Sequence, residues 1–199
     1  MRREISDRRA LRTRQLLTEA LGDLIRTKRY EAITVQEITE RANVGRSTFY
    51  AHFTDKDDLV ADSVRRMVGG LEADEPNARN TFSPSLGLFH HVEAFAEHYL
   101  MMARGRHLTL FLDGLQRELT SMFVVRLSPR VPESGETRVP VPLLAAMLAG
   151  MLITTVRAWL ESDMAAPAEE VDRCYRVAAE AALRAGLRPP AGSADLPAR

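Results

Sequence analysis

The stretch ITVQEITERANVGRSTFYAHF, residues 33–53, decides the fold of this 199-residue chain. Thr34 is followed three residues later by Glu37, which is the spacing of a capping box. In such a box the threonine hydroxyl and the glutamate side chain bond the free backbone N–H groups at the start of a helix. The pattern therefore predicts a short helix over about residues 34–42.

A three-residue break that contains a glycine, 43–45, follows this helix, and a second short helix is expected over about residues 46–53. Two short helices joined by such a turn form the helix-turn-helix pattern. Its second helix lies in the major groove of DNA, with its N-terminal residues at the base edges. Arg46 suits that position, because a guanidinium can donate two hydrogen bonds to a guanine edge. Ser47 and Thr48 can contact bases or phosphates.

Two aromatic residues, Phe49 and Phe53, are four positions apart, so they share the opposite side of this helix and are expected to be buried. Tyr50 and His52 are polar-tipped and fall on the other side. Lys56 stands in the first turn of the next helix, where a cation opposes the helix dipole, a placement that makes sense if the ammonium faces a phosphate.

Elsewhere the apolar residues recur at helical spacing, and strand-type alternation is almost absent, so the chain is expected to be all-α. The further helices are expected over about residues 8–28, 54–70, 84–103, 108–127 (one or two helices), 142–162 and 168–185. A polar stretch, 73–84, reads as a linker. The sequence therefore predicts a three-helix helix-turn-helix domain over 1–72 and a helical bundle over 73–199.

Charge, cysteine content and hydropathy indicate which kinds of surface, metal site and cellular location the chain can have. The chain holds 27 basic and 27 acidic residues, but residues 1–66 hold 14 against 11, which can supply a local phosphate-binding surface or a solvated helix face. Cys174 is the single cysteine, so neither an intrachain disulfide nor a multi-cysteine metal site is expected. The N-terminus is charged rather than apolar, which argues against a secretory signal and favours the cytoplasm. The uncharged stretch 139–156 contains two prolines and many small residues, which favours a buried helix over a membrane span.

The run 33–53, together with Lys56 and Leu59, resembles the signature of the TetR (tetracycline-repressor-like) family of bacterial transcription regulators, and the preceding helix fits as well. The resemblance covers about residues 9–62. It implies that phosphates are held mainly by Thr48, Tyr50, His52 and Lys56, and that Gln36, Arg46 and Ser47 are the better candidates for reading bases. The full expected DNA-binding set is Thr34, Gln36, Arg46, Ser47, Thr48, Tyr50, His52 and Lys56. Gly45 departs from the many relatives that have serine there, although glycine is an acceptable N-cap.

The second domain resembles the family only in its pattern of helices. The resemblance implies a homodimer through the helices at about 142–162 and 168–185, and a pocket for a small-molecule effector. The small residues on both helices permit the close approach of a partner, and a two-fold dimer would present its recognition helices about 34–36 Å apart to a palindromic operator. The candidate ligand-binding residues are Phe95, Tyr99, Met102, Phe111, Met122, Met147 and Met151. Plain core positions are the alternative for most of them.

The histidines His91 and His98 are seven residues apart and share a helix face, but polar lining or plain surface is favoured over a metal site. No metal and no cofactor are expected. The function predicted is a sequence-specific repressor that a small apolar ligand releases from its operator. An activator, or a regulator controlled by a protein partner, is the alternative. An enzyme is disfavoured, since the sequence has neither a glycine-rich phosphate loop nor a nucleophile motif.

Overall fold

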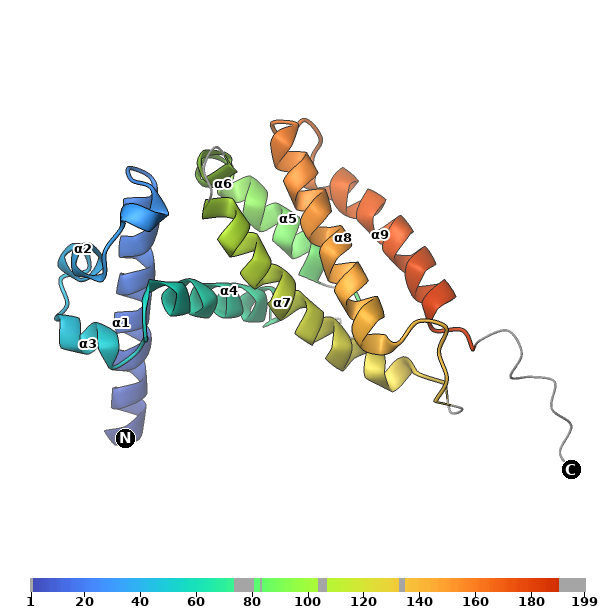
Figure 1. Cartoon of the computed structure of the whole chain (residues 1–199), viewed down its shortest axis with the longest axis horizontal. Helices are drawn as coiled ribbons and strands as arrows, with labels where there is room; N and C mark the ends of the chain where they lie inside the picture. Colours follow the sequence, from blue (N-terminus) through green and yellow to red (C-terminus); the bar gives the residue numbers. More distant parts are fainter. Residues whose placement is uncertain (1, 74–80, 83, 104–106, 133–134, 190–199) are drawn as a thin grey trace, which may run out of the picture. The chain divides into compact units, whose positions relative to one another are not determined.

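The fold is all-α over the residues that the computed structural model describes, 2–73, 81–82, 84–103, 107–132 and 135–189, and no strand occurs among them. In chain order the elements are α1 (Arg2–Ile25), η1 (Tyr30–Ala32), α2 (Val35–Arg41), α3 (Arg46–Tyr50), α4 (Lys56–Ala73), α5 (Pro84–Ala94), α6 (Ala96–Ala103), α7 (His107–Leu127), η2 (Ser128–Arg130), α8 (Val141–Glu161) and α9 (Ala168–Gly186) (Figure 1). The predicted all-α class is confirmed, with a helix-turn-helix in the N-terminal part and helices in the C-terminal part.

The chain divides into two compact units. Unit 1 comprises Met1–Met67 and Glu97–Gly114, and unit 2 comprises Val68–Ala96 and Leu115–Arg199. Helix α4 therefore belongs to unit 1 for most of its length and to unit 2 from Val68 onward. The domain boundary predicted at residues 72–73 stays a prediction.

The core of unit 1 explains why α1 to α4 fold together. Leu17, Ile38, Phe49 and Leu59, one from each of these helices, have no exposed surface. Each such side chain contributes about 1.5–3 kcal/mol by leaving water. These four residues are the inward positions that helical periodicity predicts, so one apolar stripe from each helix builds a single core.

The predicted helix boundaries hold in part. Helix α1 begins at Arg2 rather than near residue 8, and the helix predicted over 84–103 is interrupted at Phe95, between α5 and α6. The Phe95 amide still donates to the His91 carbonyl at 3.2 Å, so the interruption is confined to one residue. Neither glycine nor proline lies at this point, so no residue type there indicates a break in the helix.

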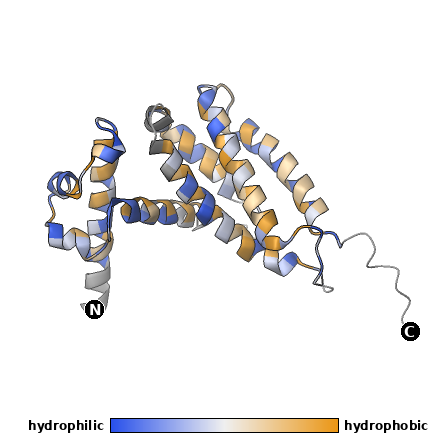
Figure 2. Ribbon diagram, in the orientation of Figure 1, coloured by the Kyte–Doolittle hydropathy of each residue, from blue (hydrophilic) through white to orange (hydrophobic). Residues whose placement is uncertain are grey.

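Helix α8 is the centre of unit 2. Nine of its residues are buried, and apolar positions recur along it (Figure 2). Trp159 packs edge-on against Phe89 of α5, with ring centroids 5.6 Å apart, and its indole N–H donates to the Ala166 carbonyl. Among the described residues α8 is the one helix long and apolar enough to cross a membrane, and half of that stretch is covered by the rest of the protein.

Gly186 ends α9 in a way that the sequence does not predict. A C-terminal glycine suggests a left-handed cap, but Gly186 is the last helical residue, and the cap is Leu187 with a φ of −82°. The glycine is needed for packing instead, because a Cβ atom there would lie 3.0 Å from Leu144 Cδ2. The segment before α8 bonds this same end, since the Val139 amide donates to the Gly186 carbonyl at 3.1 Å.

We expect Gly186→Ala to lower the free energy of unfolding by about 1 kcal/mol, because crowding against buried Leu144 outweighs the better helix propensity of alanine. Gly69→Ala is the matched control, since its Cβ atom would meet nothing within 4 Å in the same unit. It should stabilise by about 0.5–1 kcal/mol. Urea unfolding of both variants measures the difference, and a stabilised Gly186→Ala variant would contradict the packing explanation.

Candidate nucleic-acid interface

The start of α2 is held by the capping box that the sequence predicts. The Glu37 amide donates to Thr34 Oγ1 at 3.2 Å, and the Thr34 amide donates to Glu37 Oε2 at 2.9 Å. The Thr34 hydroxyl also donates to Glu37 Oε2. Two backbone donors are thereby satisfied at the entry to the motif, which fixes where α2 begins.

The turn between α2 and α3 depends on Asn43. Its φ is 53°, in the left-handed region that asparagine tolerates better than most residues. The Val44 amide then closes the turn on the Thr39 carbonyl at 3.0 Å. Gly45, which marked the break in the sequence, has an ordinary φ of −72° and serves as the N-cap of α3. The residue whose conformation makes the turn is therefore the asparagine.

Helix α3 has one buried side and one exposed side, as predicted. Phe49 and Phe53 are 0% and 3% exposed, and their ring centroids lie 5.7 Å apart. Tyr50, by contrast, is 53% exposed. The aromatic pair anchors the helix in the core of unit 1, so that its other side is free to meet a partner.

The predicted DNA-binding residues differ in how far they are engaged within the protein. Arg46 and Ser47 are exposed in the first turn of α3, and Thr48 and His52 are half-buried. Neither Arg46 nor Ser47 has a side-chain hydrogen bond or ion pair with any residue that the structure describes. Thr34 is engaged in the capping box, and the Gln36 amide donates to Glu40 at 2.8 Å. Thr48, Tyr50 and His52 likewise have no side-chain hydrogen bond or ion pair with a described residue, so the available groups run along α3 and the turn after it.

Lys56 is engaged inside the protein. Its ammonium donates to the backbone carbonyls of Tyr30 at 2.7 Å and Ile33 at 2.9 Å, with a longer contact to Glu31. The same Nζ lies 4.4 Å from the centroid of the Tyr30 ring. Lys56 thus fastens the start of α4 to η1, a role that neither its position nor its charge predicts. A phosphate contact from this residue stays a prediction.

Two further contacts secure the segment around η1. The buried Tyr30 hydroxyl donates to the Asp57 carboxylate, and burial, followed by this bond, raises the tyrosine pKa. Lys28 pairs with Glu37, the capping-box residue. This bond, with the two from Thr34, lowers the pKa of the Glu37 carboxyl from 4.5 to about 2.

Sequence reasoning missed the polar contacts between helices of unit 1. Arg41 of α2 pairs with Asp23 of α1 at 2.7 Å, and Arg14 of α1 bonds Asp62 of α4 at the same distance. Asp62 is buried, yet it stands one turn after Leu59 on the apolar stripe of α4. An acidic residue on such a stripe is the signal that could have indicated a buried partner.

The candidate ligand residues are distributed over both units of the chain. Tyr99 and Phe111 of unit 1 pack together, with ring centroids 5.7 Å apart, and burial raises the pKa of the Tyr99 hydroxyl. In unit 2, Met122 is 8% exposed, Met147 is 50% exposed and Met151 is half-buried. Phe95 is also exposed, and the Met102 side chain lies outside the described residues. A ligand role for these seven residues stays a prediction.

The two histidines singled out by the sequence, His91 and His98, also belong to different units. His91 stacks near Phe95, with centroids 4.9 Å apart, and the His98 side chain lies outside the described part of the chain. Among the side chains that the structure describes, no three His, Cys, Asp or Glu residues gather as metal ligands would. His90, their neighbour, instead pairs with Glu169 at 3.0 Å on the surface.

Comparison with known proteins adds to this geometry. Residues 17–62 match the model of a family described as bacterial regulatory proteins, tetR family. The chain is 39% identical over 61 residues to YxbF of Bacillus subtilis (strain 168), described as an uncharacterized HTH-type transcriptional regulator. That match covers 30% of this chain and 16% of the length of YxbF.

Solved structures resemble the whole fold. One is a TetR transcriptional regulator from Streptococcus agalactiae 2603V, with 22% identity, a TM-score of 0.58 and coverage of 88% of this chain and 98% of that one. Another is the dihydroxyacetone kinase operon activator DhaS, with 15% identity, a TM-score of 0.56 and the same coverage. At these identities the likeness concerns the fold alone.

We expect Lys56→Met to lower the free energy of unfolding by about 2–4 kcal/mol, because two half-buried carbonyls lose a charged donor while the aliphatic stem remains. Lys28→Met, at the only other lysine of the chain, removes a half-exposed ion pair and should cost less. Thermal and urea unfolding of the two variants give the comparison. Equal losses of unfolding free energy in the two variants would show that the bonds from Lys56 to the backbone of η1 add no stability beyond that of a surface ion pair.

The pH dependence of stability should carry the signature of Glu37. Because the pKa of its carboxyl is about 2 in the folded protein and ordinarily 4.5, ionised Glu37 stabilises the fold above pH 4.5, and this contribution is lost as pH falls toward 2. Glu37→Gln should therefore be less stable than the unchanged protein at pH 7, and the gap should narrow between about pH 4.5 and 2. Unfolding midpoints of both proteins, measured at several pH values between 2 and 7, give this difference in stability. A difference that stays constant between pH 4.5 and 2 would contradict the lowered pKa of Glu37.

Proposed function

This chain belongs to the TetR family of bacterial regulatory proteins, and on that premise we propose that it is a sequence-specific DNA-binding transcription regulator that acts as a homodimer. One observation carries the proposal: the first turn of α3 offers exposed Arg46 and Ser47 with no side-chain partner among the described residues, above a buried aromatic pair. Donors at the N-terminal end of a recognition helix are the groups that meet base edges. The family and the similar structures are transcription regulators, not enzymes.

The contacts are divided between bases and phosphates. Arg46 and Ser47 read bases in the major groove, with Gln36 contributing after it leaves Glu40. Thr48, Tyr50 and His52 hold phosphates and set the register of α3, with Thr34 and Lys56 at the margin of the interface. Such a regulator works in the cytoplasm, where the bacterial chromosome lies.

A second copy of the chain covers the outer face of α8 and α9. Leu143 is 54% exposed, Met147 one turn later is 50% exposed, and Val177 of α9 is 68% exposed. Large apolar side chains exposed on adjoining helices favour a protein partner. An isologous dimer through this face presents two recognition helices to a palindromic operator.

The regulator acts as a repressor whose operator affinity falls when a small apolar ligand binds among its helices. The abundance of Met and aromatic side chains on α5 to α8 supports an apolar ligand. Activation, or control by a protein partner, is the second candidate, because DhaS, which shares the fold, is described as an operon activator. Reporter expression with the gene deleted separates the two, since loss of a repressor raises expression.

We expect Arg46→Ala to weaken binding to its preferred duplex by about 1–3 kcal/mol and to relax base preference at one position of each half-site. Arg117→Ala is the control, because it removes an exposed arginine of α7, outside both α3 and the proposed dimer face. It should change neither affinity nor preference. Titrations of both variants at several salt concentrations, on selected and on scrambled duplexes, provide the readout. Unchanged preference in Arg46→Ala would remove this residue from base reading.

We expect Leu143→Glu to shift the protein from dimer to monomer at micromolar concentration, because two carboxylates would be buried across the interface. Val125→Glu introduces the same charge at a 72% exposed position of α7, outside this face, and should remain dimeric. Sedimentation velocity distinguishes the two states. A dimeric Leu143→Glu variant would place the interface elsewhere.

A further inference from the structure

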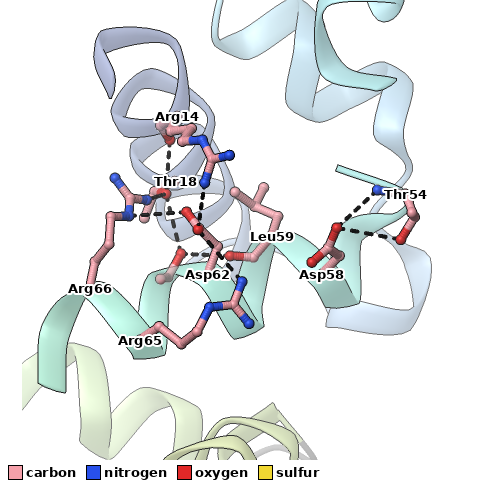
Figure 3. A network of polar contacts seen from close by, with 9 residues as sticks. Arg14, Thr18, Thr54, Asp58, Leu59, Asp62, Arg65 and Arg66 are labelled. Atoms are coloured by element: carbon pink, nitrogen blue, oxygen red, sulfur yellow. Dashed lines mark hydrogen bonds and ion pairs between the residues drawn. The ribbon is translucent and has the colours of Figure 1, made fainter. Parts of the chain in front are cut away.

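Asp62 of α4 is surrounded by three guanidinium groups (Figure 3). The carboxylate residue is 5% exposed. Arg14 Nη1 lies 2.7 Å and Arg65 Nη2 3.6 Å from Asp62 Oδ1, and Arg66 Nε lies 3.1 Å from Oδ2. Arg65 and Arg66 belong to α4 itself, whereas Arg14 comes from α1. The Arg14 contact is therefore the one ion pair of this cluster that joins two helices.

Arg14 also reaches the residues that seat the recognition helix. Its guanidinium carbon lies 5.4 Å from the centroid of the Phe53 ring. Phe53 in turn packs against Phe49, the buried residue of α3. A guanidinium over an aromatic face is held by attraction between the cation and the ring. One side chain thus contacts both the carboxylate of α4 and the aromatic pair beneath α3.

A second set of hydrogen bonds joins α1 and α4 at the same level. Arg66 Nη2 donates to Thr18 Oγ1 at 2.6 Å, and this hydroxyl lies 3.2 Å from Ser63 Oγ. Hydrogen bonds have preferred directions, unlike apolar contacts, so they fix the rotation of α4 about its axis relative to α1. Helix α4 then continues from unit 1 into unit 2.

We propose that Arg14 and Asp62 are positioning residues, which hold α3 in a fixed orientation relative to α4. Asp62 orients Arg14, Arg14 supports Phe53, and Phe53 supports the recognition helix, so a rotation of α4 alters how α3 is presented. The consequence for DNA rests on the function proposed above. The coupling itself is a property of unit 1 and exists without DNA.

The ion pair between Arg14 and Asp62 can break without leaving the buried carboxylate unpaired. A buried carboxylate that loses its partner is strongly destabilising. Asp62 keeps Arg65 and Arg66, at positions i+3 and i+4 of its own helix, when Arg14 moves away. The contact between Arg66 Nε and Asp62 Oδ2 lacks hydrogen-bond geometry in this structure. Arg66 can therefore form a hydrogen bond with this carboxylate when the Arg14 contact breaks. The link between the helices is therefore releasable.

Hydrogen exchange of the full-length protein without DNA tests the coupling. Arg14→Ala should speed the exchange of amides 49–53 about tenfold, as expected for a modest coupling between sites, at a temperature where circular dichroism shows a folded protein. Arg65→Ala removes the same charge from the same carboxylate, but it leaves the contact between α1 and Phe53 intact. Equal exchange of these amides in the two variants would overturn the proposal.

Arg14→Lys provides a second variant, which keeps the charge but loses the guanidinium over the Phe53 ring. In this variant the exchange rate of amides 49–53 should lie between the rates in the unchanged protein and in Arg14→Ala. If Arg14→Ala exchanges faster throughout unit 1, the arginine only stabilises the fold, and the proposal fails. Selective loss of protection at 49–53 supports it.

Binding to a duplex selected by the unchanged protein from a random-sequence library tests the consequence for DNA. Arg14→Ala should lower the ratio of selected to scrambled affinity about tenfold, with the salt dependence unchanged. A salt slope lower by about one would make Arg14 a direct phosphate contact and overturn the positioning role. If the unchanged protein enriches no sequence, the proposed function fails, and the exchange result still decides the coupling.

Discussion

The burial of Phe49 under α3 is the contact on which the rest of the N-terminal unit depends. This side chain has no exposed surface, and it packs against Phe53, which in turn meets Arg14. A five-residue helix cannot persist by its own hydrogen bonds, so its orientation is set by what lies beneath it. The aromatic pair supplies that foundation, and the remaining side of α3 is left to present Arg46, Ser47 and Tyr50. Exposure of the polar side follows from burial of the apolar one.

Charged residues of unit 1 serve the fold more than their surface positions suggest. Lys56 bonds backbone carbonyls of η1, Arg14 and Arg66 bond groups between α1 and α4, and Arg41 pairs with Asp23. These contacts fix the helices around the aromatic core. Arg46, in contrast, has no side-chain partner among the described residues and stands in the first turn of α3, and we propose it as a base contact for both reasons. A count of basic residues would not have separated the two groups.

The local features of the motif were predictable, and the contacts across it were not. The capping box at Thr34 and the buried face of α3 follow from spacing along one helix, so the sequence indicates them directly. Asn43 was overlooked because glycine is the more familiar residue in a turn, although asparagine also tolerates a positive φ. The carbonyls that Lys56 bonds lie 23 or more positions away in the chain, and Arg14 lies 48 positions from Asp62. Their pairing depends on how helices pack, which spacing alone does not give.

Selection of duplexes from a random-sequence library by the unchanged full-length protein tests whether α3 is a recognition helix. We expect enrichment of a palindrome whose half-sites are centred one helical turn, or about 10 base pairs, apart, or a multiple of this spacing. Affinity for that duplex should fall steeply with salt. Failure of a folded dimer to enrich any sequence, at low as well as at physiological salt, would contradict the assignment of α3 as a recognition helix.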